Sequence, residues 1–268
     1  MVFYWAETME STHTYLLDYI KKYDSIDTPF VVATKEQTGG IGSRGNTWQQ
    51  VTCGLYFSCL LHKTLLPQDL PMQSASIYFG SIFLEIFRDF NPNLWLKWPN
   101  DFYIEDSKVG GLLTQNIRDY VIFGIGLNLI SSQHKALFQT YPHYDSIARE
   151  WAKDYVTNRI SLENYCNEWI LYAIVYKILD FLSFNIVKFD FTNTIHYQDS
   201  QNMCKAFLHT NRTWYAVLGR YSQEFHKNHR FTTHIVEDGI EKRVSLKNAK
   251  LQHDGSILLH NTILYGLR

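Results

Sequence analysis

The chain has 268 residues, which suffices for one large domain or for a larger and a smaller one. Its 25 Lys and Arg residues nearly balance its 26 Asp and Glu residues, so the formal net charge is -1. This balance lacks the basic excess that sequence-independent nucleic acid binding requires. No apolar run approaches the roughly 20 residues that cross a bilayer. We therefore expect a protein that binds neither DNA nor a membrane.

The cysteine pattern points to a reducing compartment. Cys53, Cys59, Cys166 and Cys204 form no C-x-x-C pair and no regular disulfide framework. Such usage is typical of reduced, mostly buried thiols. The N-terminus also lacks the basic and then apolar stretches of a secretory signal. These features predict a cytoplasmic protein.

The first half of the chain interleaves short strands with helices. Residues 2–5 are expected to form a strand, after which Ser11 or Thr12 caps a helix. A second helix is expected at 71–90, where apolar residues are spread widely enough to imply deep burial. Further strands are expected at 30–33, 55–61, 94–98, 102–105, 111–116 and 120–128. This order predicts an α+β fold, a mixed β-sheet with helices packed on one face.

The second half is less regular. Residues 131–190 have a helical pattern, whereas residues 190–220 are polar and give no clear assignment. From Phe231 onward, short alternating runs are broken by turn residues, which predicts a small all-β unit of hairpins. We therefore expect two domains, a larger one at 1–220 and a small β domain at 221–268.

A glycine-rich loop lies between two of the predicted strands. Gly40-Ile41-Gly42-Ser43-Arg44-Gly45 matches the pattern G-x-G-x-x-G. A dinucleotide fingerprint should open a helix, but the residues that follow are β-like, and no carboxylate stands about 20 residues further on. An ordinary surface turn would also explain the loop. Its glycine amides and the Arg44 guanidinium nevertheless suit an anion such as phosphate.

The most informative segment is Lys97-Trp98-Pro99-Asn100-Asp101, followed by Lys108-Val109-Gly110-Gly111-Leu112-Leu113. Taken singly, its members have ordinary explanations as a proline turn and solvated strand ends. Three further blocks accompany it, namely Glu10 to His13, the loop from Gln37 to Trp48, and Gly124 to Asn128. In this joint order the sequence resembles the biotin–protein ligases, firmly over residues 1–130 and loosely in the C-terminal β unit.

The resemblance implies an ATP-dependent enzyme. It would activate biotin to biotinyl-5'-AMP with release of pyrophosphate, using Mg²⁺. It would then transfer biotin to a lysine of a biotin carboxyl carrier protein. The implied fold is the biotin/lipoate ligase catalytic fold, related to class II aminoacyl-tRNA synthetases, with an SH3-like C-terminal domain. Because the Ser-Thr block begins at residue 11, no room is expected before it for a DNA-binding domain. Relatives often pair through the catalytic sheet, so a homodimer is possible by analogy.

The resemblance also implies the site residues. The expected catalytic residues are Lys108, Lys97 and Asp101. Biotin would contact Ser11, Thr12, Gln37, Gly40, Trp48, Lys108, Gly111 and Leu112. ATP and the adenylate would contact Gly42, Arg44, Lys97, Asn100, Lys108 and Asn128. Mg²⁺ would be met by Asn100 and Asp101, although this ion usually keeps several waters and takes few protein ligands.

The chain departs from the family pattern at three positions. The family loop usually reads G-R-G-R-x-G, whereas here Ile41 and Ser43 stand at the two arginine places. We hypothesise that the adenylate is held less tightly as a result. His13 stands where the family often has Asn. Two alternatives remain open: a lipoate ligase or octanoyltransferase, which shares the superfamily fold, and a non-catalytic biotin or adenylate sensor.

Overall fold

The computed structural model describes residues 2–42, 47–48, 51, 53–131, 134–138, 171, 174–175, 178, 195–197, 213–237 and 240–266. Within these ranges the main feature is an 8-stranded sheet with the order β4-β5-β6-β7-β3-β2-β1-β8. Its strands are β1 (Val2–Met9), β2 (Phe30–Gln37), β3 (Cys53–His62), β4 (Leu94–Lys97), β5 (Asp101–Ile104), β6 (Ser107–Ile117), β7 (Tyr120–Ile130) and β8 (Ile195–Tyr197). β1 and β2 run parallel, and the other neighbouring pairs are antiparallel. The expected mixed sheet is confirmed.

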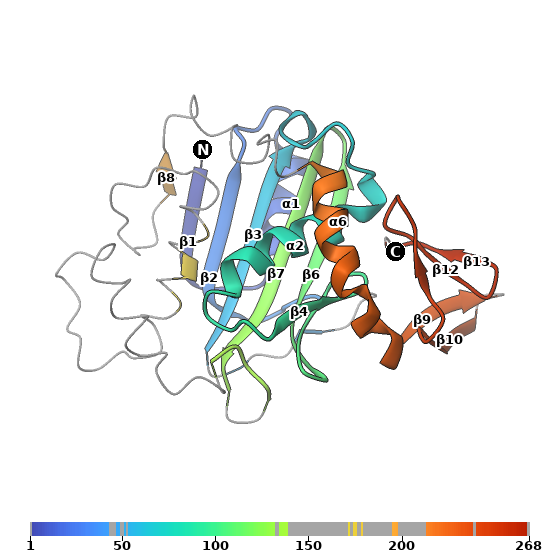
Figure 1. Cartoon of the computed structure of the whole chain (residues 1–268). Helices are drawn as coiled ribbons and strands as arrows, with labels where there is room; N and C mark the ends of the chain where they lie inside the picture. The colour runs from blue at the N-terminus through green and yellow to red at the C-terminus, as the bar shows by residue number, and fades with distance from the viewer. Residues whose placement is uncertain are drawn as a thin grey trace.

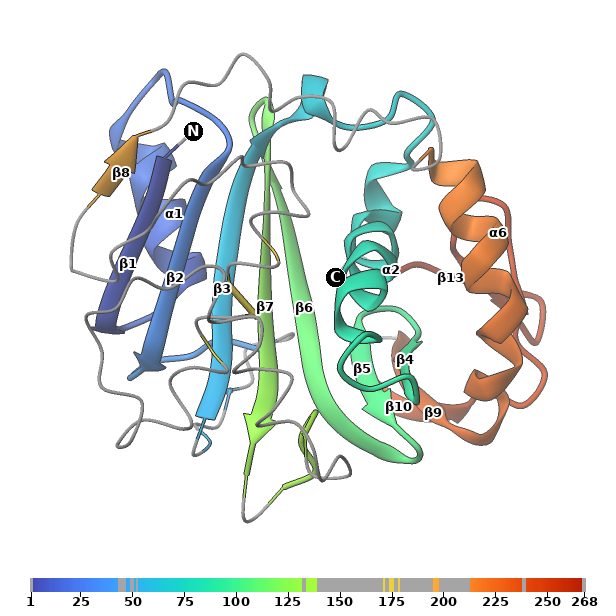
Figure 2. The same cartoon turned by 60° about the vertical axis from the view of Figure 1, so that its left-hand side comes forward.

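Helices cover both faces of this sheet, not one as expected (Figures 1 and 2). Helix α1 (Thr12–Lys22) connects the parallel strands β1 and β2, so it must cross over one face. Leu16 of α1 packs there with Phe30 and Val32 of β2. The alternate residues of β2 belong to a second core cluster, which also contains α2 (Ala75–Phe87) and α6 (Trp214–Glu224). Because side chains alternate along a strand, α1 and α2 lie on opposite faces.

The two predicted helices of the first half are present, with shifted bounds. Ser11 is the N-cap of α1, where its hydroxyl oxygen accepts from the backbone N–H of Thr14 at 3.3 Å. The predicted helix 71–90 begins later and ends earlier, because a 3₁₀ turn, η3 (Met72–Ser74), precedes α2. Nearly every side chain of α2 is buried, as its all-round apolar pattern predicts.

Helix α6 lies partly in the segment that the sequence pattern left unassigned. Its buried residues are Trp214, Val217 and Tyr221, spaced as one stripe of a surface helix. Thr213 caps it, and the Asp69 carboxylate accepts from the backbone N–H groups of Trp214 and Tyr215, both at 3.1 Å. The predicted helical region 131–190 falls largely outside the described residues, although the described positions 171, 174, 175 and 178 are helical.

The C-terminal segment forms the expected small all-β unit. After η5 (Phe225–Arg230), β9 (Thr232–Glu237) and β10 (Ile240–Ser245) make a two-stranded sheet. A three-stranded sheet follows with β11 (Lys250–Leu251), β12 (Ile257–Leu259) and β13 (Thr262–Leu264). These strands lie beside α6, next to the β4 edge of the main sheet (Figure 1).

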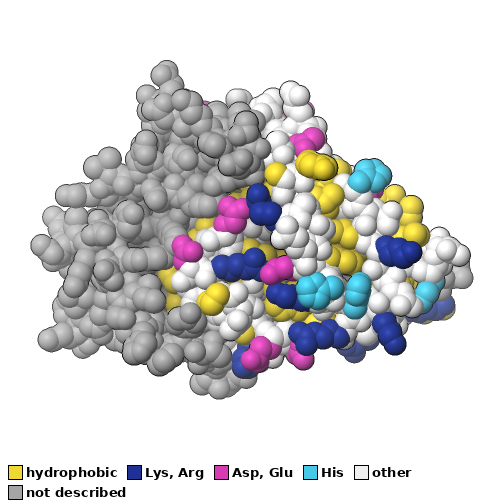
Figure 3. All heavy atoms as spheres, viewed as in Figure 1, with side chains coloured by type: hydrophobic (Ala, Val, Ile, Leu, Met, Phe, Trp, Pro, Cys, Tyr) yellow, Lys and Arg dark blue, Asp and Glu magenta, His cyan; other side chains and the backbone are white. Residues whose placement is uncertain are grey.

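On the face drawn in Figure 3, charges of both signs are interspersed over the described part of the surface. Ion pairs among the described residues include Arg220 with Glu85 and Lys227 with Glu224. Among the described residues, no helix has the length and apolarity that crossing a membrane requires.

Candidate active site

A cavity of about 320 Å³ lies where the start of α1, the end of β2 and the middle of β6 and β7 meet. Eleven of the residues predicted for the site line it: Ser11, Thr12, Gln37, Gly42, Trp48, Asn100, Asp101, Lys108, Gly111, Leu112 and Asn128. Gly40 and Lys97 lie beside the cavity, and Arg44 lies outside the described residues. The fold therefore brings together residues that are more than a hundred positions apart in the sequence.

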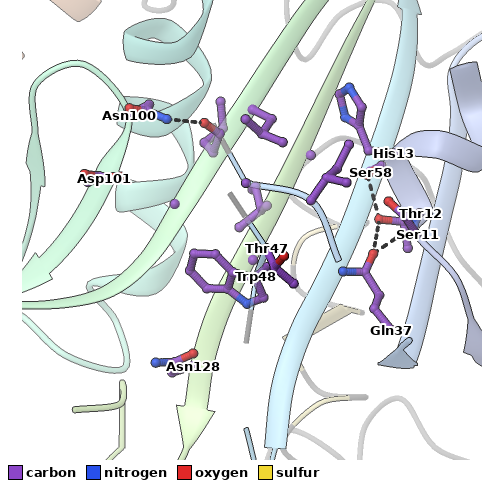
Figure 4. Close-up of a pocket in the computed structure, with 18 of the residues that line it drawn as sticks. Ser11, Thr12, His13, Gln37, Thr47, Trp48, Ser58, Asn100, Asp101 and Asn128 are labelled. Atoms are coloured by element: carbon purple, nitrogen blue, oxygen red, sulfur yellow. Dashed lines mark hydrogen bonds between the residues drawn. The ribbon is translucent and has the colours of Figure 1, made fainter. Parts of the chain in front are cut away.

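One end of the cavity holds a directed chain of hydrogen bonds (Figure 4). The backbone N–H and the hydroxyl of Thr12 donate to Gln37 Oε1, at 2.8 and 3.1 Å. Thr12 has a single hydroxyl hydrogen, so its 2.7 Å contact with Ser58 Oγ is one in which Ser58 donates. This order leaves the amide N–H groups of Gln37 as donors and the lone pairs of Ser58 as acceptors for a ligand.

Trp48 forms an apolar wall between this polar chain and the turn that carries Asn100 and Asp101 (Figure 4). The indole packs so closely on Gly126 that a Cβ there would lie 2.8 Å from Trp48 Cε2. Gly40 permits a similar approach, since its Cβ would lie 3.2 Å from Trp48 Cβ and 3.0 Å from Gln37 Nε2. The two glycines thus let the ring lie flat in the cavity.

The other end of the cavity is charged. Lys108 Nζ lies 2.7 Å from Asp101 Oδ1, and Lys97 Nζ lies 3.9 Å from Asp101 Oδ2. Lys97 is mostly buried, with its Nζ 5.6 Å from the centre of the Tyr103 ring, while 41% of the Lys108 side chain is exposed. Lys108 can therefore meet a ligand in the cavity directly, whereas Lys97 lies beside the Asp101 carboxylate and does not line the cavity.

The turn between β4 and β5 is fastened to β6 by a pair of hydrogen bonds. The Leu112 N–H donates to the Asn100 carbonyl oxygen at 2.9 Å, and Asn100 Nδ2 donates to the Leu112 carbonyl oxygen at 2.7 Å. Asn128 is likewise held in place, because its Nδ2 donates to the Lys135 carbonyl oxygen at 3.3 Å. The polar groups around the cavity are thus fixed before a ligand binds.

The expected magnesium ligands fit a cation poorly. Both oxygens of Asp101 face ammonium groups, and Asn100, whose Nδ2 donates to the Leu112 carbonyl oxygen, could offer a cation only one neutral side-chain oxygen. Among the described residues, no group of three His, Cys, Asp or Glu side chains could hold a metal ion. These residues do not form a magnesium site by themselves.

Two buried polar residues that line the cavity were not among the predicted site residues. Ser58 is fully buried and is the only small polar residue within the apolar run from Leu55 to Leu61, a signal that could have found it. His13 is 5% exposed and lines the cavity; its Nε2 lies 3.4 Å from Gln115 Oε1, and its buried Nδ1 has no hydrogen-bond partner among the described residues. Burial lowers the pKa of His13, and the contact with Gln115 offsets part of this effect.

The glycine-rich loop is followed by a strand and not by a helix, and its residues 43–46 lie outside the described part of the chain. Ile41 and Thr47 form an antiparallel bridge, and β3 follows. This agrees with the objection to a dinucleotide fingerprint.

A second cavity of about 530 Å³ adjoins the first and shares Gly42, Asn100 and Leu112 with it. Its remaining lining comes partly from the C-terminal segment, including Thr233 and Tyr265.

Comparison with known proteins gives three kinds of match. The model of the Biotin/lipoate A/B protein ligase family matches residues 5–129, which contain most of the sheet from β1 to β7 and most of the residues that line the cavity. Among curated proteins, the chain is 28% identical over 128 residues to the bifunctional ligase/repressor BirA of Escherichia coli. It is also 30% identical over 131 residues to the biotin–protein ligase of Homo sapiens. These matches cover 45% and 44% of this chain, but only 38% and 18% of the two relatives.

Solved structures are similar to this chain over nearly its whole length. It is similar to the biotin acetyl coenzyme A carboxylase synthetase of Helicobacter pylori with bound biotinylated ATP, with a TM-score of 0.68 and 29% identity over 98% of both chains. The biotin protein ligase of Aquifex aeolicus in complex with biotin and ATP shares the fold, with a TM-score of 0.57 at 19% identity over 99% of this chain and 95% of that one. The expected biotin-ligase catalytic fold is therefore confirmed.

Proposed function

We propose that the protein is a biotin–protein ligase. It joins biotin and ATP to give biotinyl-5'-AMP and pyrophosphate, and then transfers biotin to the ε-amine of a lysine on a biotin carboxyl carrier protein. One observation carries this proposal: the Thr12–Gln37 chain and the Lys108–Asp101 pair lie at opposite ends of one cavity. That arrangement suits a molecule with a neutral polar ring at one end and a carboxylate at the other.

The polar end matches a ureido ring, which offers one carbonyl and two N–H groups. Gln37 supplies the N–H donors, and Ser58 and Ser11 supply hydroxyl oxygens, while Trp48 covers the apolar part of the ring. The backbone at Gly111 and Leu112 completes this wall. A dithiolane or alkyl chain cannot pair with these groups, which would leave them buried without partners. The cavity therefore favours biotin over lipoate or octanoate.

Activation requires that the carboxylate of biotin attack the α-phosphorus of ATP, so two anions must approach each other. The Lys108 ammonium group, which lines the cavity, would leave its ion pair with Asp101 and bind these anions. Lys97 would then compensate the negative charge of Asp101. The carboxylate oxygen forms a bond to phosphorus, and pyrophosphate leaves.

The nucleotide would lie along Gly42, Asn100 and Asn128 at the same end of the cavity as Lys108. Their amides can bond phosphate, ribose or base without adding charge. Arg44 is expected to add a permanent positive charge, a role that rests on the sequence alone.

Transfer requires a neutral acceptor amine. A free lysine has a pKa of about 10.4, so deprotonating it at pH 7 costs about 4–5 kcal/mol. We assign this task to Asp101, whose carboxylate reaches the cavity between the two lysines. The amine attacks the acyl carbon, AMP leaves, and the proton passes to Asp101.

We further propose a domain boundary, a cellular compartment and partners. We place the domain boundary near residue 220, which falls within α6. The protein would act in the cytoplasm on a carrier such as that of acetyl-CoA carboxylase, would not bind DNA, and could form a homodimer.

The direct test is incorporation of labelled biotin into a purified carrier domain, with and without ATP. The proposal predicts ATP-dependent labelling of one lysine. Labelling by lipoate instead would indicate the lipoate ligase alternative. Biotin binding with no labelling would indicate a sensor.

A further inference from the structure

The turn from Lys97 to Asp101, which we call the catalytic turn, is held by the C-terminal segment as well as by β6. The Trp98 backbone N–H donates to Asn228 Oδ1 at 2.8 Å, and Trp98 Nε1 donates to the Gly255 carbonyl oxygen at 3.0 Å. Asn228 is fully buried and Trp98 is 1% exposed. Water therefore cannot replace either hydrogen bond without a rearrangement.

Asn228 is itself fixed in one orientation. Its side-chain Nδ2 donates to the Phe225 carbonyl oxygen at 3.0 Å, and its backbone carbonyl oxygen accepts from the Phe231 N–H at 2.9 Å. An amide flip would set Nδ2 against the Trp98 N–H and Oδ1 against a carbonyl, so the observed orientation is the one that satisfies all partners. Asn228 thus links the backbone of Trp98 to η5 through hydrogen bonds.

The residues that flank Trp98 carry the charges of the site. Lys97 and Asp101 are cross-strand partners at the end of the β4–β5 pair, and the turn that joins them contains Trp98. Phe231, three residues after Asn228, packs on Tyr103 at 5.2 Å between ring centres, and Lys97 Nζ lies over that same ring. A displacement of Trp98 would therefore shift both ends of the catalytic turn.

We infer that Asn228 is a positioning residue, which sets the placement of Lys97 and Asp101 through its hydrogen bond to the Trp98 backbone. This role rests on the proposed function, because it concerns the same reaction. Asn228 does not line the cavity, so it acts on the rate and not on the contacts with the biotin ring.

The test is a single-turnover measurement of biotinyl-AMP formation in the full chain, with wild type, Asn228→Ala and Asn228→Asp. The amplitude reports the folded, active fraction, and the rate constant reports the placement of the charges. We expect Asn228→Ala to lower the rate constant by about 100-fold, as misplacement of about 1 Å can do. Asn228→Asp keeps an acceptor for Trp98 and should recover part of the loss.

Asn91→Ala is the matched control. Asn91 is also fully buried, its Oδ1 accepts from the Asn93 N–H at 3.1 Å, and its Nδ2 donates to the Leu137 carbonyl oxygen at 2.9 Å. None of these bonds involves the catalytic turn. We expect Asn91→Ala to lower the amplitude or the thermal stability while leaving the rate constant near that of wild type.

Hydrogen exchange at the Trp98 amide gives a second readout that does not need activity. Loss of protection in Asn228→Ala together with a lower rate constant supports the role. Loss of protection with an unchanged rate constant, or a fall in amplitude alone, overturns it. If Asn228→Ala does not fold, the same comparison applies to Asn228→Asp and Asn228→Ser. If the wild-type chain forms no biotinyl-AMP, the proposed function and this role are both overturned. If wild type and Asn228→Ala form it with equal rate constants, only this role is overturned.

Discussion

The Nζ atom of Lys108 lies 2.7 Å from Oδ1 of Asp101, inside a cavity whose far end is formed by Thr12 and Gln37. The Asp101 side chain is 18% exposed and that of Lys108 is 41% exposed, so the pair lies at the border between protein and solvent. A ligand anion that binds Lys108 must compete with Asp101 for the ammonium group. Under the proposed function, binding would therefore release the carboxylate that we assign as the proton acceptor of the transfer step.

Asp101→Ala should separate the two half-reactions. Adenylate formation should fall by less than about tenfold, because Lys108 remains available to the anions. Transfer to the carrier should fall by about 100-fold or more, the usual contribution of a general base. Quench-flow measurement of each step checks this, with the exposed Asp106→Ala as control. Equal losses in both steps would remove Asp101 from the transfer mechanism.

Thr12→Val should weaken biotin binding by about tenfold or more. Valine keeps the shape of threonine but leaves the Ser58 hydroxyl without its acceptor and removes one donor to Gln37, a loss of about 1–3 kcal/mol for a buried unpaired group. Calorimetry would give the Kd. Thr34→Val is the matched control, since Thr34 is also fully buried and its hydroxyl donates to the Ala6 carbonyl oxygen at 2.8 Å, outside the cavity. If both variants bind biotin equally well, the polar chain does not recognise the ligand.

His13 should make stability depend on pH. Burial lowers the pKa of His13 below its ordinary value of 6.5, so the unfolded chain binds a proton at a pH where the folded chain does not. The free energy of unfolding should therefore fall as the pH drops below 6.5, by at most about 1.4 kcal/mol per pH unit, until the folded-state pKa is reached. Urea unfolding between pH 7.5 and 5 compares wild type with His13→Asn. Parallel curves for the two proteins would exclude this contribution.

Ser43→Arg should slow the release of biotinyl-AMP. The variant restores one of the two arginines expected at this loop, and a charged hydrogen bond contributes roughly 1.5–3 kcal/mol, equivalent to about ten- to hundredfold in rate. Dissociation of labelled adenylate from wild type and variant gives the comparison. An unchanged dissociation rate would refute the hypothesis that the natural loop holds the adenylate loosely.

Local sequence signals predicted much of the fold, and their failures have physical causes. β3 and α2 were found because each is an apolar run of the right length that is buried almost throughout. The placement of α1 on the opposite face was missed, since a helical stripe shows that a face is buried but not against which side of a sheet. Helix α6 was missed because its first half lies in the stretch 190–220, which is polar as a whole and gave no clear assignment, although Trp214, Val217 and Tyr221 form a helical stripe.

The site was predictable wherever a motif carried it. The segments around Thr12, Gln37, Asn100 and Lys108 meet at one cavity, as the order of the motifs implies. The support from Asn228 was beyond reach, because it joins residues 130 positions apart through a single hydrogen bond. The pairing of Asp101 with both lysines could not be derived either, since it depends on the register of β5 with β4 and β6.

The central claim is that Lys108 brings the carboxylate of biotin and the α-phosphate of ATP together in this cavity. The most direct measurement is formation of biotinyl-AMP from biotin and α-labelled ATP with no carrier present, in wild type, Lys108→Gln and the exposed control Lys21→Gln. The account predicts biotin-dependent adenylate in wild type and Lys21→Gln, and a rate lower by about 100- to 1000-fold in Lys108→Gln. Adenylate formation that is unaffected by Lys108→Gln, or that requires lipoate in place of biotin, would contradict it.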